Sequence, residues 1–212
     1  MTSVVILISG RGSNFVNLVK KAKYYTVSYV IANKASEGIK KAEELGIPSA
    51  VFPKEKFSSI KDQKRTIFEF VKSLNPNIIA LAGFMQILEP YFVQEFFGSL
   101  VNIHPSLLPK YPGLNTHKRV LEAGDVWHGA TVHFVDEGVD TGPIIAQKKI
   151  KVLPTDTEEK LASRVLKNVE HTLYPWVMNW LAQKKIFLKQ KKVCYTEEVK
   201  EDAKKYDIIL PE

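Results

Sequence analysis

Residues 98–109 read Gly-Ser-Leu-Val-Asn-Ile-His-Pro-Ser-Leu-Leu-Pro, and this stretch is the most informative part of the 212-residue chain. A glycine–serine turn leads into a short apolar run, and two prolines follow it. Because proline cannot donate a hydrogen bond inside a sheet, the pattern predicts a buried strand that ends near His104. Side chains alternate along a strand, so Asn102 and His104 are expected to share one face at its carboxyl end.

The pair of Asn102 and His104 combines a hydrogen-bond donor with a group whose charge changes near neutral pH. Open α/β sheets bind ligands in the crevice beyond the carboxyl ends of their strands. The pair therefore indicates a binding or catalytic site. On these two residues alone the alternative stays open that both merely satisfy the backbone of the following loop.

The rest of the chain alternates apolar runs with segments of helical spacing. Strands are predicted at residues 4–8, 27–32, 50–52, 77–82, 127–135 and 144–152, and helices at 15–23, 38–45, 58–74, 90–96, 116–123 and 157–183. The alternation over the first 100 residues predicts an α/β fold with a doubly wound, mostly parallel, Rossmann-like sheet. The two later strands predict an antiparallel extension, and Pro175 is a candidate break in the long C-terminal helix.

We expect a single domain over residues 1–212, with one half at 1–100 and the other at 101–212. Hydrophobic residues make up 45% of the chain and charged residues 25%, which is typical of a soluble globular protein. No apolar run approaches the ~20 residues that span a bilayer. The run at residues 4–8 is too short for the core of a signal peptide. Cys194 is the only cysteine, which fits a reducing cytoplasm.

The formal charge of +7 has two competing explanations, nucleic-acid binding and attraction of small anionic ligands. The basic residues are mostly lysines dispersed along the chain, and no arginine-rich or aromatic-interleaved nucleic-acid module is present. We therefore interpret most of this charge as solvated surface and expect neither a nucleic-acid nor a membrane partner.

A glycine-rich segment, Gly10-Arg11-Gly12-Ser13-Asn14-Phe15, lies between the first predicted strand and helix. Backbone N–H groups at a helix N-terminus attract anions, and glycine lets an anion approach closely. A dinucleotide fingerprint would need a third glycine where Phe15 stands, and a Walker loop would need Gly-Lys-Ser/Thr. A monophosphate site is thus the better interpretation, although a simple tight turn is the alternative.

Three other segments carry candidate functional residues. Asp140 lies in the acidic, glycine-rich loop at residues 136–143, and a carboxylate near an imidazole raises the pKa of that imidazole. His133, on the strand before it, could face the same pocket or be structural. The apolar loop at 83–88 could wall a planar ligand or pack in the core. The pair at 170–171 reads as helix surface from the sequence pattern alone.

Several longer motifs show a resemblance to a known family. They are ISGRGSN near the start, LAGFMQIL, VNIHPSLLPKYPGLNTHKRVLEAGD, HGATVHFVDEGVDTGPII and EHTLYPWV. Together they cover nearly the whole chain, which resembles the phosphoribosylglycinamide formyltransferase family. The resemblance implies the formyltransferase fold. It also implies transfer of the formyl group of 10-formyltetrahydrofolate, the co-substrate, to the glycinamide amine of 5′-phosphoribosylglycinamide. The products are the N-formyl compound and tetrahydrofolate, in de novo purine biosynthesis.

The resemblance also implies roles for individual residues. Asn102, His104 and Asp140 match the catalytic trio, in which the amide and a protonated imidazole, kept charged by Asp140, stabilise an oxyanion. Substrate-binding positions are Gly12, Ser13, Asn14 and Glu170. Folate-binding positions are Met85, Gln86, Ile87, Leu88, Val139 and Asp140, together with Asn102. The half at 1–100 would hold the phosphate, and the half at 101–212 would carry the folate-binding and catalytic residues.

The chain departs from its relatives at two folate positions. Many relatives carry arginine where Gln86 stands, and another arginine falls on Ile60, where neighbouring Lys61 is the candidate substitute. No metal is expected, because no cluster has ligand spacing. The expected partners are the two small-molecule substrates, and the expected state is a monomer or a weak homodimer. The alternative function is a 10-formyltetrahydrofolate hydrolase, which directs water to the same carbon.

Overall fold

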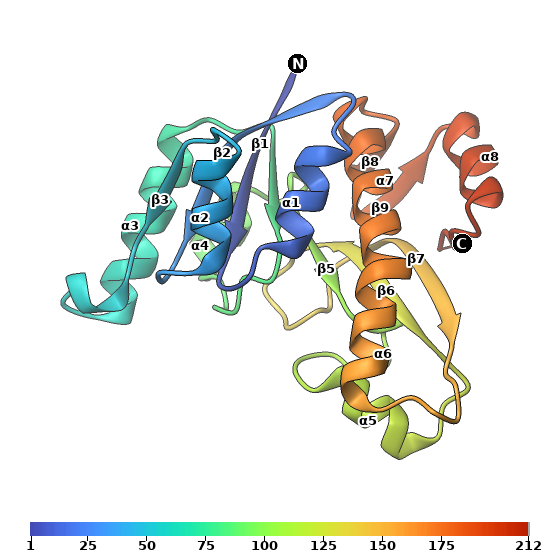
Figure 1. The fold of residues 1–212 in the computed structure, drawn as a ribbon. Helices are drawn as coiled ribbons and strands as arrows, with labels where there is room; N and C mark the ends of the chain where they lie inside the picture. The colour runs from blue at the N-terminus through green and yellow to red at the C-terminus, as the bar shows by residue number, and fades with distance from the viewer. Residues whose placement is uncertain (212) are drawn as a thin grey trace. The chain divides into compact units, whose positions relative to one another are not determined.

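A computed structural model describes residues 1–211 of the chain, which divides into two compact units, Met1–Val101 and Asn102–Glu212. The first unit contains four strands (Figure 1): β1 Thr2–Ile8, β2 Tyr25–Ala32, β3 Ser49–Val51 and β4 Ile78–Leu81. Its helices are α1 Ser13–Lys20, α2 Glu37–Glu44, α3 Ile60–Ser73 and α4 Pro90–Glu95, with a 3₁₀ turn at Lys54–Lys56. The sequence predicted the bounds of all of these strands and α-helices to within a few residues, but it did not predict the 3₁₀ turn.

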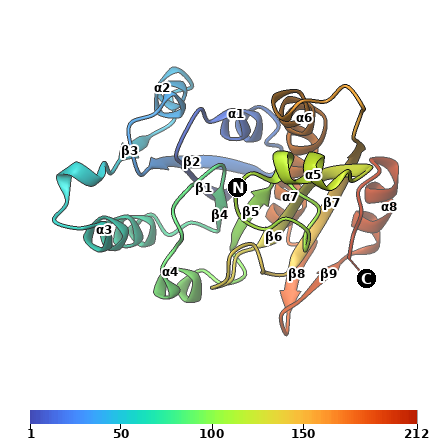
Figure 2. The same ribbon diagram turned by 90° about the horizontal axis from the view of Figure 1, so that it is seen from below.

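The sheet of the first unit is parallel, in the order β3-β2-β1-β4. Every residue from Val4 to Ile8 is fully buried, because helices cover both faces of the sheet. Helices α1 and α2 lie on one face and α3 and α4 on the other, as Figure 2 shows. This arrangement confirms the doubly wound, mostly parallel sheet. It also explains why the strands are continuous apolar runs rather than alternating patterns.

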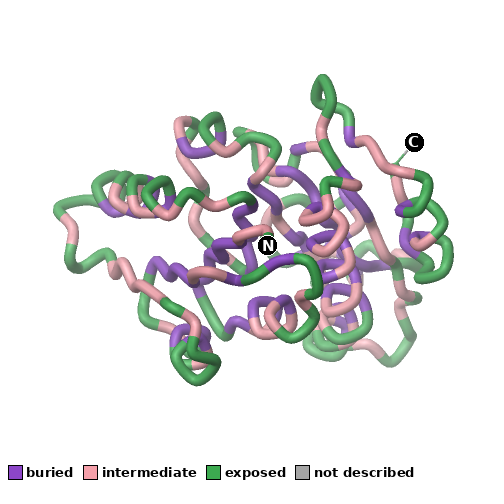
Figure 3. The backbone as a smooth tube through the Cα atoms, turned by 90° about the horizontal axis from the view of Figure 1, so that it is seen from above, coloured by how far each residue is buried: buried purple, intermediate pink, exposed green. Residues whose placement is uncertain are grey.

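Strand β5, Leu100–His104, runs across the boundary, so its last three residues belong to the second unit. That unit also contains β6 Trp127–Phe134 and β7 Ile144–Lys151, and the strand order is β5-β6-β7. Strands β6 and β7 pair antiparallel, which confirms the predicted extension. Helix α5 is Thr116–Ala123, and α7, His171–Ala182, packs against both β6 and β7. In Figure 3 the buried stretches of backbone, in purple, lie towards the interior, and the exposed stretches, in green, lie towards the outside.

The predicted single helix at 157–183 is wrong in detail. It consists of α6 Glu158–Val165, a π-helical turn at Leu166–Glu170, and α7. Pro175 lies inside α7 and does not end it. A proline near the start of a helix removes only one backbone hydrogen bond, and a wider turn just before it can absorb the change. The irregularity therefore falls at residues 166–170 instead of at the proline.

The segment after α7 forms regular secondary structure, which was not predicted from its lysine-rich sequence. It forms the hairpin β8 Ile186–Lys189 and β9 Lys192–Tyr195, followed by α8 Glu197–Lys205. The Asp202 carboxylate of α8 accepts hydrogen bonds from the indole N–H groups of Trp176, at 2.8 Å, and Trp180, at 3.3 Å. These bonds attach α8 to α7.

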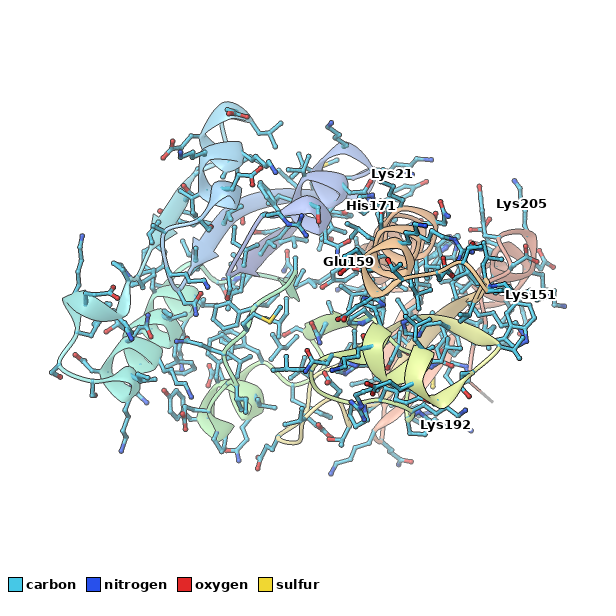
Figure 4. All side chains as sticks on the ribbon, turned by 60° about the horizontal axis from the view of Figure 1, so that its bottom comes forward. Lys21, Lys151, Glu159, His171, Lys192 and Lys205 are labelled. Atoms are coloured by element: carbon cyan, nitrogen blue, oxygen red, sulfur yellow. The ribbon has the colours of Figure 1, made fainter. Side chains whose placement is uncertain are left out.

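The surface of the second unit carries dispersed positive charge. Lys151, Lys192 and Lys205 are exposed and lie at its periphery (Figure 4). Within residues 1–211, no helix is long and apolar enough to cross a membrane. In the same residues, no group of three or more histidine, cysteine, aspartate or glutamate side chains is placed to hold a metal ion.

Candidate active site

The end of β5 places Asn102 and His104 as the sequence pattern predicts. Asn102 is half-buried, and His104 is 5% exposed at the last position of the strand. Val101 and Ile103, which alternate with them, are buried. The strand thus uses its apolar residues for the core and presents an amide and an imidazole together at its carboxyl end.

Asp140 reaches His104 from the loop between β6 and β7. Its Oδ2 atom lies 3.2 Å from His104 Nδ1 and accepts a hydrogen bond of 2.8 Å from the Gly113 N–H. The other ring nitrogen, His104 Nε2, lies 2.8 Å from the carbonyl oxygen of Tyr111. A carbonyl can only accept, so Nε2 carries a proton and Nδ1 is the nitrogen that faces the carboxylate. The loop at 105–113, whose role the sequence did not reveal, therefore orients both members of the pair.

His133 joins the same cluster and connects to Asn102. Its Nδ1 lies 2.8 Å from the Phe134 carbonyl, so the proton of a neutral ring sits there and Nε2 is an acceptor. Asn102 Nδ2 donates to that Nε2 over 3.3 Å. Asp140 Oδ1 lies 3.7 Å from the same nitrogen. The strand register shifts between Val132 and His133, a bulge that re-aims side chains. His133 thus fixes which end of the Asn102 amide is the donor.

The pKa of His104 is set by two opposing effects. Burial lowers the pKa of His104 below its ordinary value, and the Tyr111 carbonyl and Asp140, which both raise it, do not outweigh burial. Burial raises the pKa of Asp140, but His133, the Gly113 N–H and His104 together lower it below its usual value. Asp140 thus acts on the pKa of His104 in the predicted direction, but the net shift of that pKa is downward. Desolvation of the imidazolium is the reason.

The first loop has the geometry of an anion site at the start of α1. Gly12 immediately precedes the helix and has a φ angle of 70°. Because glycine has no side chain, none caps the first N–H groups of the helix. A Cβ atom on Gly12 would lie 2.9 Å from Gly38 Cα. Glycine is therefore required for both the left-handed backbone and the close approach to α2. Ser13, half-buried, and Asn14, 8% exposed, open the helix.

The loop after β4 exposes apolar side chains instead of packing them. Met85 is 69% exposed and Ile87 is 67% exposed. Ser9, at the end of β1, holds this loop, because its Oγ accepts from the Met85 N–H at 2.9 Å and its own N–H donates to the Gly83 carbonyl at 3.1 Å. Rigid, exposed apolar residues next to strand ends are suited to a planar ligand.

Gln86 in this loop is turned inward. Its side-chain N–H donates to Gln63 Oε1 at 2.8 Å, and the fully buried Gln63 donates in turn to the backbone carbonyls of Asn33 and Phe52. The amide at position 86 therefore braces the loop. Ile60, the other departure from the relatives, is 55% exposed at the start of α3.

Two predicted binding residues of the second unit differ in exposure. Glu170 is the last residue of the π-helical turn and is only 8% exposed, so the interpretation of this position as helix surface is wrong. π-Helical turns recur at functional sites in proteins. Val139 is 49% exposed beside Asp140.

A pair of histidines on α5 and β6 lies outside the cluster of Asn102, His104, His133 and Asp140. His117 Nδ1 is 2.9 Å from Nε2 of His128, which is only 1% exposed. Burial is the main cause that lowers the pKa of both, and it brings that of His128 from 6.5 to about 4. A lowered pKa contributes stability that is complete above pH 6.5 and is lost as the pH falls towards 4.

We therefore expect the free energy of unfolding to fall by about 2 kcal/mol between pH 7 and pH 5 through His128 alone. Urea denaturation at the two pH values measures this loss. The variant His128→Gln keeps a polar side chain that does not titrate, and its stability should depend less on pH by that amount. An equal pH dependence in the two proteins would contradict the assignment.

The α/β fold, together with the amide and imidazole at the end of β5 and the loop carboxylate beside them, fits an enzyme of acyl-group transfer. The sequence model of the family described as formyl transferase matches residues 2–178. The chain is 41% identical over 194 residues to the phosphoribosylglycinamide formyltransferase of Haemophilus influenzae, covering 89% of this chain and 91% of the relative. It is 42% identical over 185 residues to that of Escherichia coli, covering 85% and 87%.

A solved phosphoribosylglycinamide formyltransferase from Coxiella burnetii superposes with a TM-score of 0.86 at 39% identity, covering 92% of this chain and 93% of that one. The chain belongs to the formyl transferase family and, within it, to the phosphoribosylglycinamide formyltransferases. The predicted formyltransferase fold is thereby confirmed. None of these three relatives is named a hydrolase, so the comparisons do not favour that alternative.

Proposed function

We propose that the chain transfers the formyl group of 10-formyltetrahydrofolate to the amine of 5′-phosphoribosylglycinamide, a step of de novo purine biosynthesis. The N-formyl compound and tetrahydrofolate are the products. The observation that carries the proposal is the cluster in which Asp140 lies 3.2 Å from the His104 imidazole, next to Asn102. Membership of the family supports it.

Asn102 is the oxyanion donor in this proposal. Attack of the amine on the formyl carbon turns the formyl oxygen into an oxyanion, which needs hydrogen-bond donors that are already in place. One N–H of the Asn102 amide is held by His133, and the other is available to the oxyanion.

In this proposal, His104 is protonated as the reaction proceeds, and Asp140 assists transfer of the amine's proton. In the protein without substrate, the lowered pKa of His104 favours the neutral ring. A developing oxyanion next to the ring favours the imidazolium, because an opposite charge raises the pKa of an imidazole. As the oxyanion forms, His104 takes up a proton from solvent at Nδ1, where it donates a hydrogen bond to Asp140, and returns that proton when the oxyanion collapses. Asp140 assists the passage of the attacking amine's proton through water to the leaving nitrogen, as the bond between that nitrogen and the formyl carbon breaks.

The binding roles in this proposal are those that the family resemblance implies. Gly12, Ser13 and Asn14 hold the substrate phosphate at the N-terminus of α1, where the helix dipole favours an anion. Glu170 contacts the substrate near its amine. For the folate, the binding residues are 85–88, with Met85 and Ile87 as the exposed apolar wall, together with Asn102, Val139 and Asp140.

The partners of this enzyme are its two small-molecule substrates. We assign no nucleic-acid or membrane partner, place the protein in the cytoplasm, and regard it as a monomer or a weak homodimer whose two units work as one domain. The dispersed, exposed lysines of the second unit are consistent with a solvated surface.

An assay of 10-formyltetrahydrofolate consumption with and without 5′-phosphoribosylglycinamide tests the function. We expect consumption only when the phosphorylated amine is present. Consumption at an equal rate without it would contradict the transferase assignment and favour hydrolysis.

Asp140→Asn should change the pH dependence of turnover. The Asp140 charge raises the pKa of His104, so its removal lowers that pKa further. The protonated form is then lost at lower pH, and the limb on which kcat declines with rising pH should move to lower pH. Activity near neutrality should fall with it. A kcat profile from pH 5 to pH 9 measures the shift, and a profile that keeps its position would show that Asp140 does not act on His104.

A further inference from the structure

Three hydrogen-bonded polar side chains, two buried and one half-buried, contact the loop that follows His104 in the second unit. Ser106 and Thr131 are fully buried, and Gln147 faces Thr131 across the strand pair β6–β7, where the two are register partners. Polar side chains buried in this way cost stability unless each of them is hydrogen-bonded. Their contacts show that each is.

Thr131 is bonded at every position that its hydroxyl offers. Its Oγ1 donates to the Ser106 carbonyl at 2.7 Å and accepts from the Leu108 N–H at 3.0 Å. It also accepts from the side-chain amide of Gln147 at 2.8 Å. The second N–H of that amide donates to the Leu108 carbonyl, also at 2.8 Å. Two side chains therefore fasten the backbone of residues 106–108 from both sides.

Ser106 extends the fastening to the end of the same loop. Its hydroxyl donates to the Lys110 carbonyl at 2.7 Å and lies 3.2 Å from the Tyr111 carbonyl. The Tyr111 carbonyl is the acceptor that holds His104 Nε2 at 2.8 Å. The loop that carries this carbonyl is thus held near both ends by the side chains of Thr131, Gln147 and Ser106.

The backbone of Gln147 is also hydrogen-bonded to the segment that follows α8. Its backbone N–H and carbonyl pair with the carbonyl and N–H of Ile209, each at 2.8 Å, in an isolated antiparallel bridge. Gln147 is therefore held on one side by Thr131 and on the other by Ile209, in the segment after α8.

We propose that Gln147 and Thr131 are positioning residues for His104, acting through the loop at 105–111. They hold the Tyr111 carbonyl on Nε2, which keeps Nδ1 directed at Asp140. A loop without these bonds would let the carbonyl move and the ring rotate or change tautomer, because the hydrogen bond on one nitrogen decides the state of the other. The inference rests on the proposed catalytic role of His104.

Two pairs of variants test this relay. Gln147→Leu removes both N–H donors at similar size, and Lys149→Leu places the same side chain two residues along β7, at an exposed position. Thr131→Val removes the hydroxyl at constant shape, and Thr131→Ser restores it. Each variant is compared by its urea midpoint, its kcat and KM at several pH values, and the ¹⁵N shifts of the His104 ring, assigned with His104→Ala.

We expect Gln147→Leu and Thr131→Val to lower kcat by about 10-fold with KM changed less, as is usual when a supporting hydrogen bond of a site is lost. The ¹⁵N shifts should show that Nε2 is no longer the fixed N–H position. Thr131→Ser and Lys149→Leu should match the wild type.

Unchanged ring shifts in both Gln147→Leu and Thr131→Val would overturn the relay, whatever happens to turnover. The same holds if Thr131→Ser failed to restore the shifts. Altered shifts with normal turnover would support the relay and contradict the catalytic role of His104, so the two failures are distinguishable.

Discussion

Asn102→Ala should lower kcat by about 10²–10³, the usual cost of removing one donor to a developing oxyanion. The side chain is half-buried and its one observed side-chain bond is to His133, so the fold should remain intact. KM for both substrates should change little, because the interaction is made chiefly in the transition state. Steady-state kinetics with each substrate varied in turn measures the effect.

Asn102→Asp provides the companion variant. It keeps the shape of the side chain but carries no N–H, and its negative charge would oppose an oxyanion. Its kcat should fall at least as far as that of Asn102→Ala. Turnover within twofold of the wild type in either variant would remove the Asn102 amide from the mechanism.

Ser13→Glu should weaken binding of 5′-phosphoribosylglycinamide by about 100-fold, because two like charges roughly 5 Å apart repel by about 3 kcal/mol at an effective dielectric constant of 20. A carboxylate in the first turn of a helix is favourable for the helix itself, so α1 should be as stable as before. Binding of the folate should be unchanged, since the contacts assigned to it involve other residues. Calorimetric titration of each ligand separates the two effects.

Ser13→Gln is the matched control, with a neutral side chain of the same size. It should bind the phosphorylated amine far more tightly than Ser13→Glu does. An equal loss in both variants would point to crowding rather than charge. No loss in Ser13→Glu would refute the phosphate site at the start of α1.

Much of the fold was predictable because its signals are local. Five apolar residues from Val4 to Ile8 predict a strand covered on both faces, and proline after a strand or at the start of a helix marks its boundary, as at Pro90. The pairing of Asn102 with His104 followed from the period of two along a strand. Each of these depends only on neighbours in the sequence.

The missed features depend on burial and on distant partners. The small hydrophobic set of α8, Val199 and Ala203, lies among charged residues, and only the packed structure shows that it is buried. The lowered pKa of His104 results from desolvation, which no motif encodes. The carbonyl group of Tyr111 that orients the His104 ring belongs to the backbone, so the residue type at position 111 does not predict this hydrogen bond.

Transfer of a ¹³C label from the formyl group of 10-formyltetrahydrofolate distinguishes formyl transfer from hydrolysis in one measurement. Carbon-13 NMR of a reaction with 5′-phosphoribosylglycinamide should show the label in the N-formyl amide of the product, with one product formed per folate consumed. Label released as formate while the amine remains unmodified would contradict formyl transfer.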